Sequence, residues 1–121
     1  MIDHIDLRVA DLARTRAFFQ AALAPLGYAL HVKGPALGFG VEADRPDFWV
    51  REGGPSVPCP HVAFRCESRN LVEAAYHQAL LAGGRDNGGP RLMPHIHAHY
   101  YAAFVRDPDG HNIEFACHTD H

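Results

Sequence analysis

Two histidines and one glutamate stand at positions that could build a metal site. His4 and His61 each open a short segment of alternating polar and apolar residues, and the two segments match each other at an offset of 57 residues. Glu114 lies in a third such segment, directly after the turn sequence Asp-Pro-Asp-Gly at 107–110. Imidazole and carboxylate groups are ordinary ligands of divalent metals. The pattern therefore predicts a metal site built by gene duplication.

Such a ligand set would leave coordination positions open for a substrate. Two imidazoles and one carboxylate suit Zn²⁺, but they equally suit Fe²⁺ or Mn²⁺, so ligand identity leaves the metal undecided. A small molecule with two adjacent oxygens could chelate such an ion, which would stabilise the oxyanion formed in turnover. Electrophilic stabilisation of this kind is commonly worth about 3–4 kcal/mol.

Alternation along the strands predicts which other side chains lie beside the metal. Arg8 and Arg65 fall on the same face as the histidines and are related by the repeat. They could bind a substrate carboxylate or phosphate, or they could pair with neighbouring acidic residues. Trp49 is a candidate wall of the substrate pocket, with ordinary packing as the alternative.

The segment 88–99 is rich in Pro, Gly and His, and it predicts a loop. Its alternating histidines, His95, His97 and His99, could form a second metal site, supply a general base or belong to a solvated lid. The candidates for proton transfer are His97 and the nearby Tyr101, since imidazole and phenol are common proton shuttles. Three further histidines are expected to be exposed, namely His111, His118 and His121.

The elements that position these residues are duplicated as well. Asp11 and Ser68 are good N-cap residues, and Gly27 and Gly84 stand where a left-handed residue would end each helix. Turn residues after each helix separate short strand patterns. These strands are expected over 28–33, 37–43 and 47–51 in the first half and over 85–87, 100–106 and 111–117 in the second. Each half is thus predicted to be a βαβββ module in an α+β fold.

The composition predicts one soluble globular domain of 121 residues. Module one spans residues 1–57 and module two spans 58–121, with a Gly- and Pro-rich hinge at 53–58. A formal net charge of −3 argues against a nucleic-acid binder, and no apolar run is long enough to cross a membrane. The three cysteines show no paired spacing and are interpreted as reduced thiols of a cytoplasmic protein.

The chain resembles the vicinal oxygen chelate superfamily of glyoxalases, extradiol dioxygenases, fosfomycin-resistance thiol transferases and bleomycin-resistance proteins. The resemblance rests on His-Ile-Asp-Leu at 4–7, the helix at 11–27, His-Val-Ala-Phe at 61–64 and the closing run at 100–114. It implies that the two modules form a cupped, incomplete eight-stranded barrel around a divalent ion (Zn, Fe, Mn or Ni). It also implies a homodimer, with the ligands of one site drawn from one chain or from two.

The resemblance carries the metal ligands over to His4, His61 and Glu114. Glyoxalases proper use a fourth ligand, a glutamate on the last strand of the first module, and the residue matched to it here is Trp49. The nearest acid, Glu52, lies three residues further on, so strand alternation turns it to the opposite face. This departure favours relatives that use three ligands.

Two functions of different classes follow from these residues. The first is a metal-dependent enzyme, a lyase or isomerase of glyoxalase type or a dioxygenase, acting on a small molecule that chelates the metal through adjacent oxygens. The alternative is a metal-free protein that binds and sequesters a small molecule, as bleomycin-resistance relatives do. A thiol transferase is the third possibility, and no potassium or thiol site in the sequence supports it.

Overall fold

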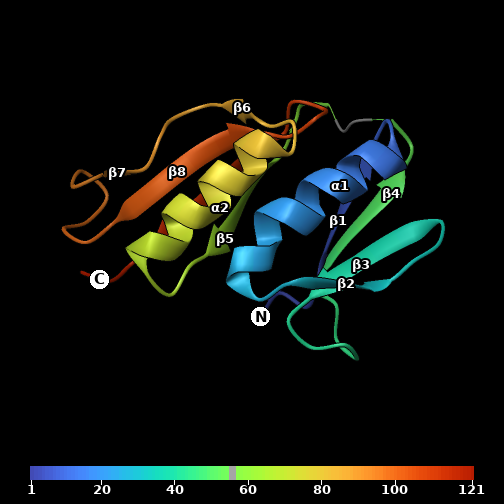
Figure 1. Ribbon diagram of the computed structural model, residues 1–121, viewed down its shortest axis with the longest axis horizontal. Coiled ribbons are helices and arrows are strands. Elements are labelled where there is room, and N and C mark those ends of the chain that lie inside the picture. Colours follow the sequence, from blue (N-terminus) through green and yellow to red (C-terminus); the bar gives the residue numbers. More distant parts are fainter. Residues whose placement is uncertain (55–56) are drawn as a thin grey trace.

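The structure is a computed structural model that describes residues 1–54 and 57–121, so two residues of the expected hinge lie outside it. The first half follows the predicted βαβββ order, and the second follows it with one additional short strand, β7 (Arg91–Leu92), as Figure 1 shows. The first half contains β1 (Ile5–Val9), α1 (Leu12–Leu23), the 3₁₀-helix η1 (Ala24–Leu26), β2 (Ala29–Val32), β3 (Ala36–Gly40) and β4 (Phe48–Glu52). The second contains β5 (His61–Arg65), α2 (Arg69–Leu81), β6 (Arg85–Asp86), β7 (Arg91–Leu92), β8 (Tyr101–Arg106) and β9 (Asn112–Cys117). The short strand β7 lies inside the segment predicted to be a loop.

The strands form two open sheets, one from each half, which confirms the α+β class and the absence of a closed barrel in the described part of the chain. The strand orders are β1-β4-β3-β2 and β5-β9-β8-β6, with β7 paired to β8. In each sheet the first strand of the half pairs in parallel with the last, so Asp6 lies opposite Trp49 and Ala63 opposite Glu114. The expected match between Trp49 and Glu114 is therefore present in the register.

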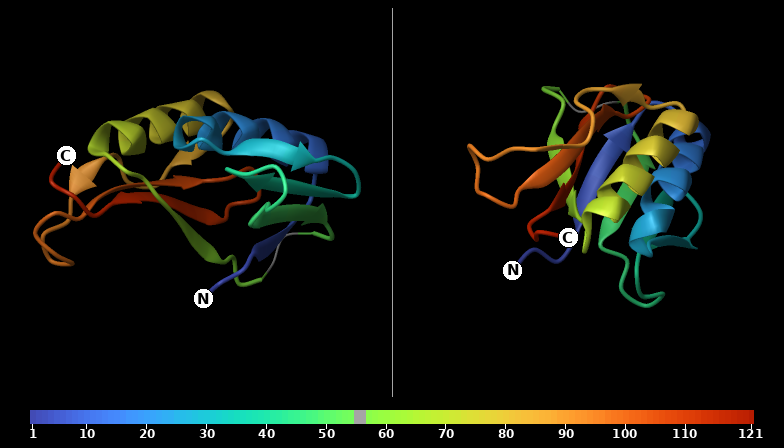
Figure 2. Two further views of the ribbon diagram at one scale, coloured as in Figure 1. Left: turned by 90° about the horizontal axis from the view of Figure 1, so that it is seen from below. Right: turned by 60° about the vertical axis from the view of Figure 1, so that its left-hand side comes forward.

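The two helices lie side by side on one side of the sheets, as Figures 1 and 2 show. Leu7 and Val9 of β1, like Val62 and Phe64 of β5, are buried beneath them. The alternate residues of the same strands, Asp6 and Arg8 in β1 and His61, Ala63 and Arg65 in β5, are exposed on the other side. The predicted division of these strands into a helix-covered face and an open face is confirmed except at Ile5, which was expected on the covered face with Leu7 and Val9 but is 38% exposed.

Aromatic rings connect the two halves through a common core. Phe19 of α1 packs edge-on against Phe48 with ring centroids 4.9 Å apart, and Phe48 packs in the same way against Phe64 of β5 at 5.1 Å. Phe64 in turn stacks on Phe115 of β9. Edge-to-face aromatic pairs add to the free energy that burial itself supplies. The halves therefore share one hydrophobic core rather than folding around separate ones.

The helix ends follow the predicted chemistry with one correction. Asp11 accepts a hydrogen bond from the backbone N–H of Arg14, and Ser68 accepts one from Leu71, as N-cap residues do. Gly27 has a left-handed φ of 82°, as predicted. After α2, however, the left-handed residue is Gly83, with φ 102°, and not Gly84.

The turn at 107–110 holds a buried contact between Asp107 and His111, which contradicts the expected exposure of His111. The imidazole of His111 is 0% exposed, and its Nδ1 lies 2.7 Å from Oδ2 of Asp107, which is equally buried. Oδ1 of Asp107 accepts from the backbone N–H groups of Asp109 and His111. The side chain that follows the turn is thus folded inward by a carboxylate within the turn.

No helix in the described residues is long and apolar enough to cross a membrane.

Candidate functional site

In module two, the side chains of His61 and Tyr100 both contact that of Glu114. We call these three residues the Glu114 cluster. Nε2 of His61 lies 2.8 Å from Oε1 of Glu114, and the hydroxyl of Tyr100 donates a short hydrogen bond to Oε2. The parallel pairing of β5 with β9 places His61 and Glu114 on neighbouring strands. Both carboxylate oxygens therefore have a hydrogen-bond donor.

Burial makes these contacts important for Glu114. Its side chain is only 5% exposed, whereas that of His61 is 50% exposed. A carboxylate withdrawn from water needs hydrogen-bonding partners, because an unpaired buried charge is strongly destabilising. Burial, together with the hydrogen bond to Glu114, raises the pKa of Tyr100 to about 12, so its hydroxyl remains a donor at neutral pH. The Glu114 carboxylate is therefore buried and hydrogen-bonded at both oxygens. Solvent reaches the cluster at the half-exposed ring of His61.

A pair of histidines packs against Tyr100. Nε2 of His97 lies 3.0 Å from Nδ1 of His118, and the edge of Tyr100 contacts both rings. The backbone N–H of His99 donates to Nδ1 of His97, so this nitrogen carries no proton. The remaining ring nitrogen, Nε2, is the one that contacts His118.

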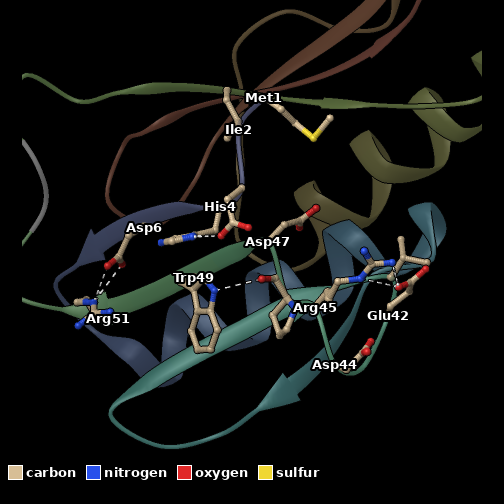
Figure 3. A pocket seen from close by; sticks show the side chains of 13 residues that line it. Met1, Ile2, His4, Asp6, Glu42, Asp44, Arg45, Asp47, Trp49 and Arg51 are labelled. Atoms are coloured by element: carbon tan, nitrogen blue, oxygen red, sulfur yellow. Dashed lines mark hydrogen bonds and ion pairs between the residues drawn. The ribbon is translucent and has the colours of Figure 1, made fainter.

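His4 lies in the other module, in a cavity of about 860 Å³. Figure 3 shows the cavity with His4, Asp6 and Trp49 close together on the open face of β1 and β4. Nδ1 of His4 lies 2.6 Å from Oδ2 of Asp3. Across the strands, Nε of Arg51 donates to Asp6 and is 2.9 Å from its nearer carboxylate oxygen. Asp6 is thus paired with Arg51. In His4, Nε2 is the ring nitrogen that Asp3 does not contact.

Trp49 is a wall of this cavity, and its position is set by neighbouring backbone. Its indole N–H donates to the carbonyl of Pro46 at 3.3 Å. A Cβ atom at Gly38, its partner on the adjacent strand, would lie 3.0 Å from the indole ring, so the ring packs closely on this glycine and would have to shift for a larger residue. Trp49 is thus fixed as a flat apolar surface beside His4.

The structure places the other predicted site residues apart. Arg65 lines a smaller cavity of about 430 Å³ between the modules, whose lining does not include Arg8. Arg8 lies instead beside Gly53 at the end of β4. Tyr101 donates to Glu73 of α2 at 2.8 Å, on the helix side of the sheet. The tyrosine that contacts Glu114 is its neighbour Tyr100, which the sequence-based prediction missed.

The register of β8 on β9 explains why Tyr100, and not Tyr101, reaches Glu114. Tyr101 pairs with Cys117 across β8 and β9, and Cys117 is buried on the helix-covered face together with Ile113 and Phe115. Since adjacent strand residues point to opposite faces, Tyr100 must then share the face of Glu114. Finding this requires the register of the two strands, which a single strand pattern does not contain.

The predicted ligands do not converge within one chain. Among residues 1–54 and 57–121, no three His, Cys, Asp or Glu side chains lie close enough together to hold one metal ion. His61 and Glu114 do fit such an ion as a pair, because a nitrogen and an oxygen that are both good ligands already face each other at 2.8 Å. His4 belongs to the other sheet and presents its ring to a different cavity.

Comparisons with known proteins agree with this architecture. Residues 1–115 match the family model described as the glyoxalase/bleomycin resistance protein/dioxygenase superfamily. No curated protein sequence matches the chain.

Three solved structures with the same fold are described under different names. A glyoxalase/bleomycin resistance protein from Albidiferax ferrireducens has a TM-score of 0.77 and 20% identity, over 97% of this chain and 98% of that one. A glyoxalase I mutant from Zea mays has a TM-score of 0.73 and 23% identity, over 97% of this chain but 46% of that one. A fosfomycin resistance protein from Mesorhizobium loti has a TM-score of 0.73 and 15% identity, over 98% and 92% of the two chains. At these identities the likeness establishes the fold alone.

Proposed function

Because the chain belongs to the glyoxalase/bleomycin resistance protein/dioxygenase superfamily, we propose that it is a metal-dependent enzyme acting on a small molecule with two adjacent oxygens. The reaction class is a glyoxalase-like lyase or isomerase, or a dioxygenase. One observation carries the proposal, which is the contact between Nε2 of His61 and Oε1 of the buried Glu114. A half-exposed imidazole beside a buried carboxylate supplies two ligands of the kind that Zn²⁺, Fe²⁺, Mn²⁺ and Ni²⁺ accept.

The third ligand in this proposal is His4 of a second copy of the chain. His4 is exposed, with 53% of its side-chain surface accessible, and it lies beside the open face of β1. The face of β5 that carries His61 is open as well. In a twofold dimer, module one of each protomer can face module two of its partner, which forms two equivalent sites. A homodimer therefore supplies the ligand that one chain does not bring to His61 and Glu114.

The residues of the chain have distinct roles in this site. His61 and Glu114 would hold the ion, whose chemistry when bound is to polarise the chelating oxygens and stabilise an oxyanion. Trp49, with its ring fixed against β3, walls the cavity on the side of His4. Arg8 and Arg65 are proposed to bind anionic groups of the substrate. His97, on the loop beside Tyr100, is proposed to transfer a proton, while Tyr101 is engaged by α2.

The reduced cysteines support a cytoplasmic location. Cys59, Cys66 and Cys117 are all free thiols, and burial raises the pKa of Cys66 to about 12, which keeps that thiol protonated. Free thiols are typical of a reducing compartment.

The alternative function is a metal-free protein that binds a small molecule. It is favoured by the size of the cavity in module one, about 860 Å³, whose lining contains neither His61 nor Glu114. A ligand of that site would need Trp49 and the surrounding polar residues but no metal. Ligand binding in the presence of excess chelator distinguishes this function from the enzyme.

Metal analysis of tag-free protein tests the proposed enzyme. We expect about one divalent ion per chain, since each complete site uses one set of the three ligands. His61→Ala should remove the bound metal, because it deletes one of two ligands that already face each other. His77→Ala is the matched control, since His77 lies on the exposed surface of α2. Protein that binds no metal, or that keeps it in His61→Ala, would contradict the proposal.

A further inference from the structure

We propose that Tyr100 is the positioning residue of the Glu114 cluster, and that the His97–His118 pair holds Tyr100 in place. This inference rests on the proposed function, since it assigns Tyr100 the task of presenting Glu114 to a metal ion. Tyr100 does not need to touch substrate or metal in this role. Its hydroxyl donates to Oε2 of Glu114, the oxygen that His61 does not contact.

The geometry explains why a donor at this oxygen matters. A glutamate side chain has several rotatable bonds, so an isolated carboxylate can turn either oxygen toward a ligand or turn away. With Oε2 held by Tyr100, the remaining oxygen, Oε1, faces Nε2 of His61 at 2.8 Å. Removal of a partner that orients a metal ligand in this way typically lowers the affinity for the metal by about 10–100-fold.

Tyr100 is itself held by its backbone. Its carbonyl accepts a hydrogen bond from the N–H of Met93 at 2.7 Å, and its own N–H donates to the carbonyl of His97 at 3.2 Å. These bonds close the loop between β7 and β8 at its base. Tyr100 is therefore the last residue of the loop, fixed just where β8 begins.

The side chain of Tyr100 is held by the two histidines. Its ring is nearly perpendicular to both, with centroids 5.4 Å from His97 and 5.0 Å from His118. His97 lies on the loop and His118 directly follows β9, so their hydrogen bond connects the loop to the strand that carries Glu114. The contacts then run without a break from His97 and His118 through Tyr100 to Glu114.

The adjacent tyrosine offers a matched control. Tyr100→Phe and Tyr101→Phe each remove one hydroxyl from neighbouring residues, and each hydroxyl donates to a glutamate. Only the Tyr100 partner, Glu114, belongs to the proposed site. The metal-free protein would be titrated with Co²⁺, followed by its visible absorption, and with Zn²⁺ in competition against a chromophoric chelator.

We expect Tyr100→Phe to weaken Co²⁺ and Zn²⁺ binding by about 10–100-fold, the usual effect of removing a partner that orients a metal ligand. Tyr101→Phe should bind both ions as the wild type does. Affinity unchanged in Tyr100→Phe, or lowered equally in both variants, would overturn the assignment of Tyr100.

The histidine pair is tested by two variants on one loop. His97→Ala removes the hydrogen bond to His118 and should weaken metal binding in the same direction as Tyr100→Phe. His95→Ala, an exposed histidine two residues earlier, should leave the affinity unchanged. Equal affinities in His97→Ala and the wild type would remove the histidine pair from the proposal.

A readout without metal separates this inference from the proposed function. If wild-type protein binds neither ion, the proposed function fails, and the imidazole ¹⁵N signals of His61 in the metal-free protein decide on Tyr100. A change of these signals in Tyr100→Phe but not in Tyr101→Phe supports the assignment, because it means that the Tyr100 hydroxyl orients the carboxylate of Glu114 that contacts His61. Identical His61 signals in all three proteins would overturn it.

Discussion

At the scale of single residues, carboxylates hold the side chains of all four tyrosines. Each tyrosine hydroxyl donates to a carboxylate, and the pairs are Tyr28–Asp47, Tyr76–Asp86, Tyr100–Glu114 and Tyr101–Glu73. The pKa of every one of these tyrosines is raised, with burial as the first cause. Each phenol therefore stays protonated and remains a donor throughout the neutral range.

The same rule explains why His111 was assigned wrongly. A histidine directly after a Gly-containing turn is ordinarily exposed, and nothing in its own sequence neighbourhood marks it as buried. The structure buries it because Asp107 accepts from its Nδ1 and from backbone N–H groups of the turn. This network is local in sequence, but its burial depends on the strands packed around it.

Asp107→Ala is expected to destabilise the protein strongly. The change leaves the buried imidazole of His111 and two backbone N–H groups without their acceptor. Each buried donor left without an acceptor typically lowers the free energy of unfolding by about 1–3 kcal/mol. Urea denaturation followed by circular dichroism measures the change. Asp120→Ala, at an exposed carboxylate, is the control, and equal midpoints for the two variants would show that the buried pair is not stabilising.

At the scale of elements, the two helices end for different reasons. Gly27 ends the first helical segment with the left-handed backbone that the sequence predicted. At the end of α2 two adjacent glycines have different roles. Gly83 adopts the left-handed backbone conformation, and Gly84 lies against α1. A Cβ at Gly84 would be 2.7 Å from both the carbonyl oxygen of Ala79 and the ring of Phe18. Spacing located this end correctly to within one residue, but only the packing of α2 on α1 separates the two roles.

Gly84→Ala tests that packing. The added methyl group meets backbone on one side and a fully buried ring on the other, so the helices must separate to accept it. Overpacking of this kind typically costs about 1–3 kcal/mol of stability. Gly89→Ala is the matched control, since its Cβ would be 3.7 Å from the hydroxyl of Tyr76, an ordinary contact. Thermal unfolding of the two variants should differ, and equal melting temperatures would contradict the close approach.

At the scale of the whole molecule, the arrangement of the two modules determines which of the proposed metal ligands come together within one chain. The helices α1 and α2 pack side by side, and the two sheets follow one another beneath them (Figure 2). This arrangement leaves the alternate residues of β1 and β5 exposed on the side away from the helices. It also explains why His4 does not join His61 and Glu114 within one chain, although all three lie on the predicted strands.

Mixed dimers test whether the proposed site is built from two chains. His4→Ala and His61→Ala protein should each bind no metal alone. If a site combines His4 of one protomer with His61 of the other, unfolding and refolding the variants together forms mixed dimers that contain one intact site. Metal content measured after mixing should therefore recover in part. A mixture that remains metal-free despite forming dimers would place the three ligands in separate or single-chain sites.

The sequence alone determined the duplicated modules, the helix-covered and open faces of β1 and β5, and the residue types of the candidate ligands. These depend on local physics, since strand alternation, N-caps and turn residues act over a few positions. The tertiary structure decided that Tyr100 and not Tyr101 reaches Glu114, that His111 is buried, and that His4 and His61 stand apart. Each of these depends on strand register or on the docking of α1 against α2, and both are set by packing between segments far apart in the chain.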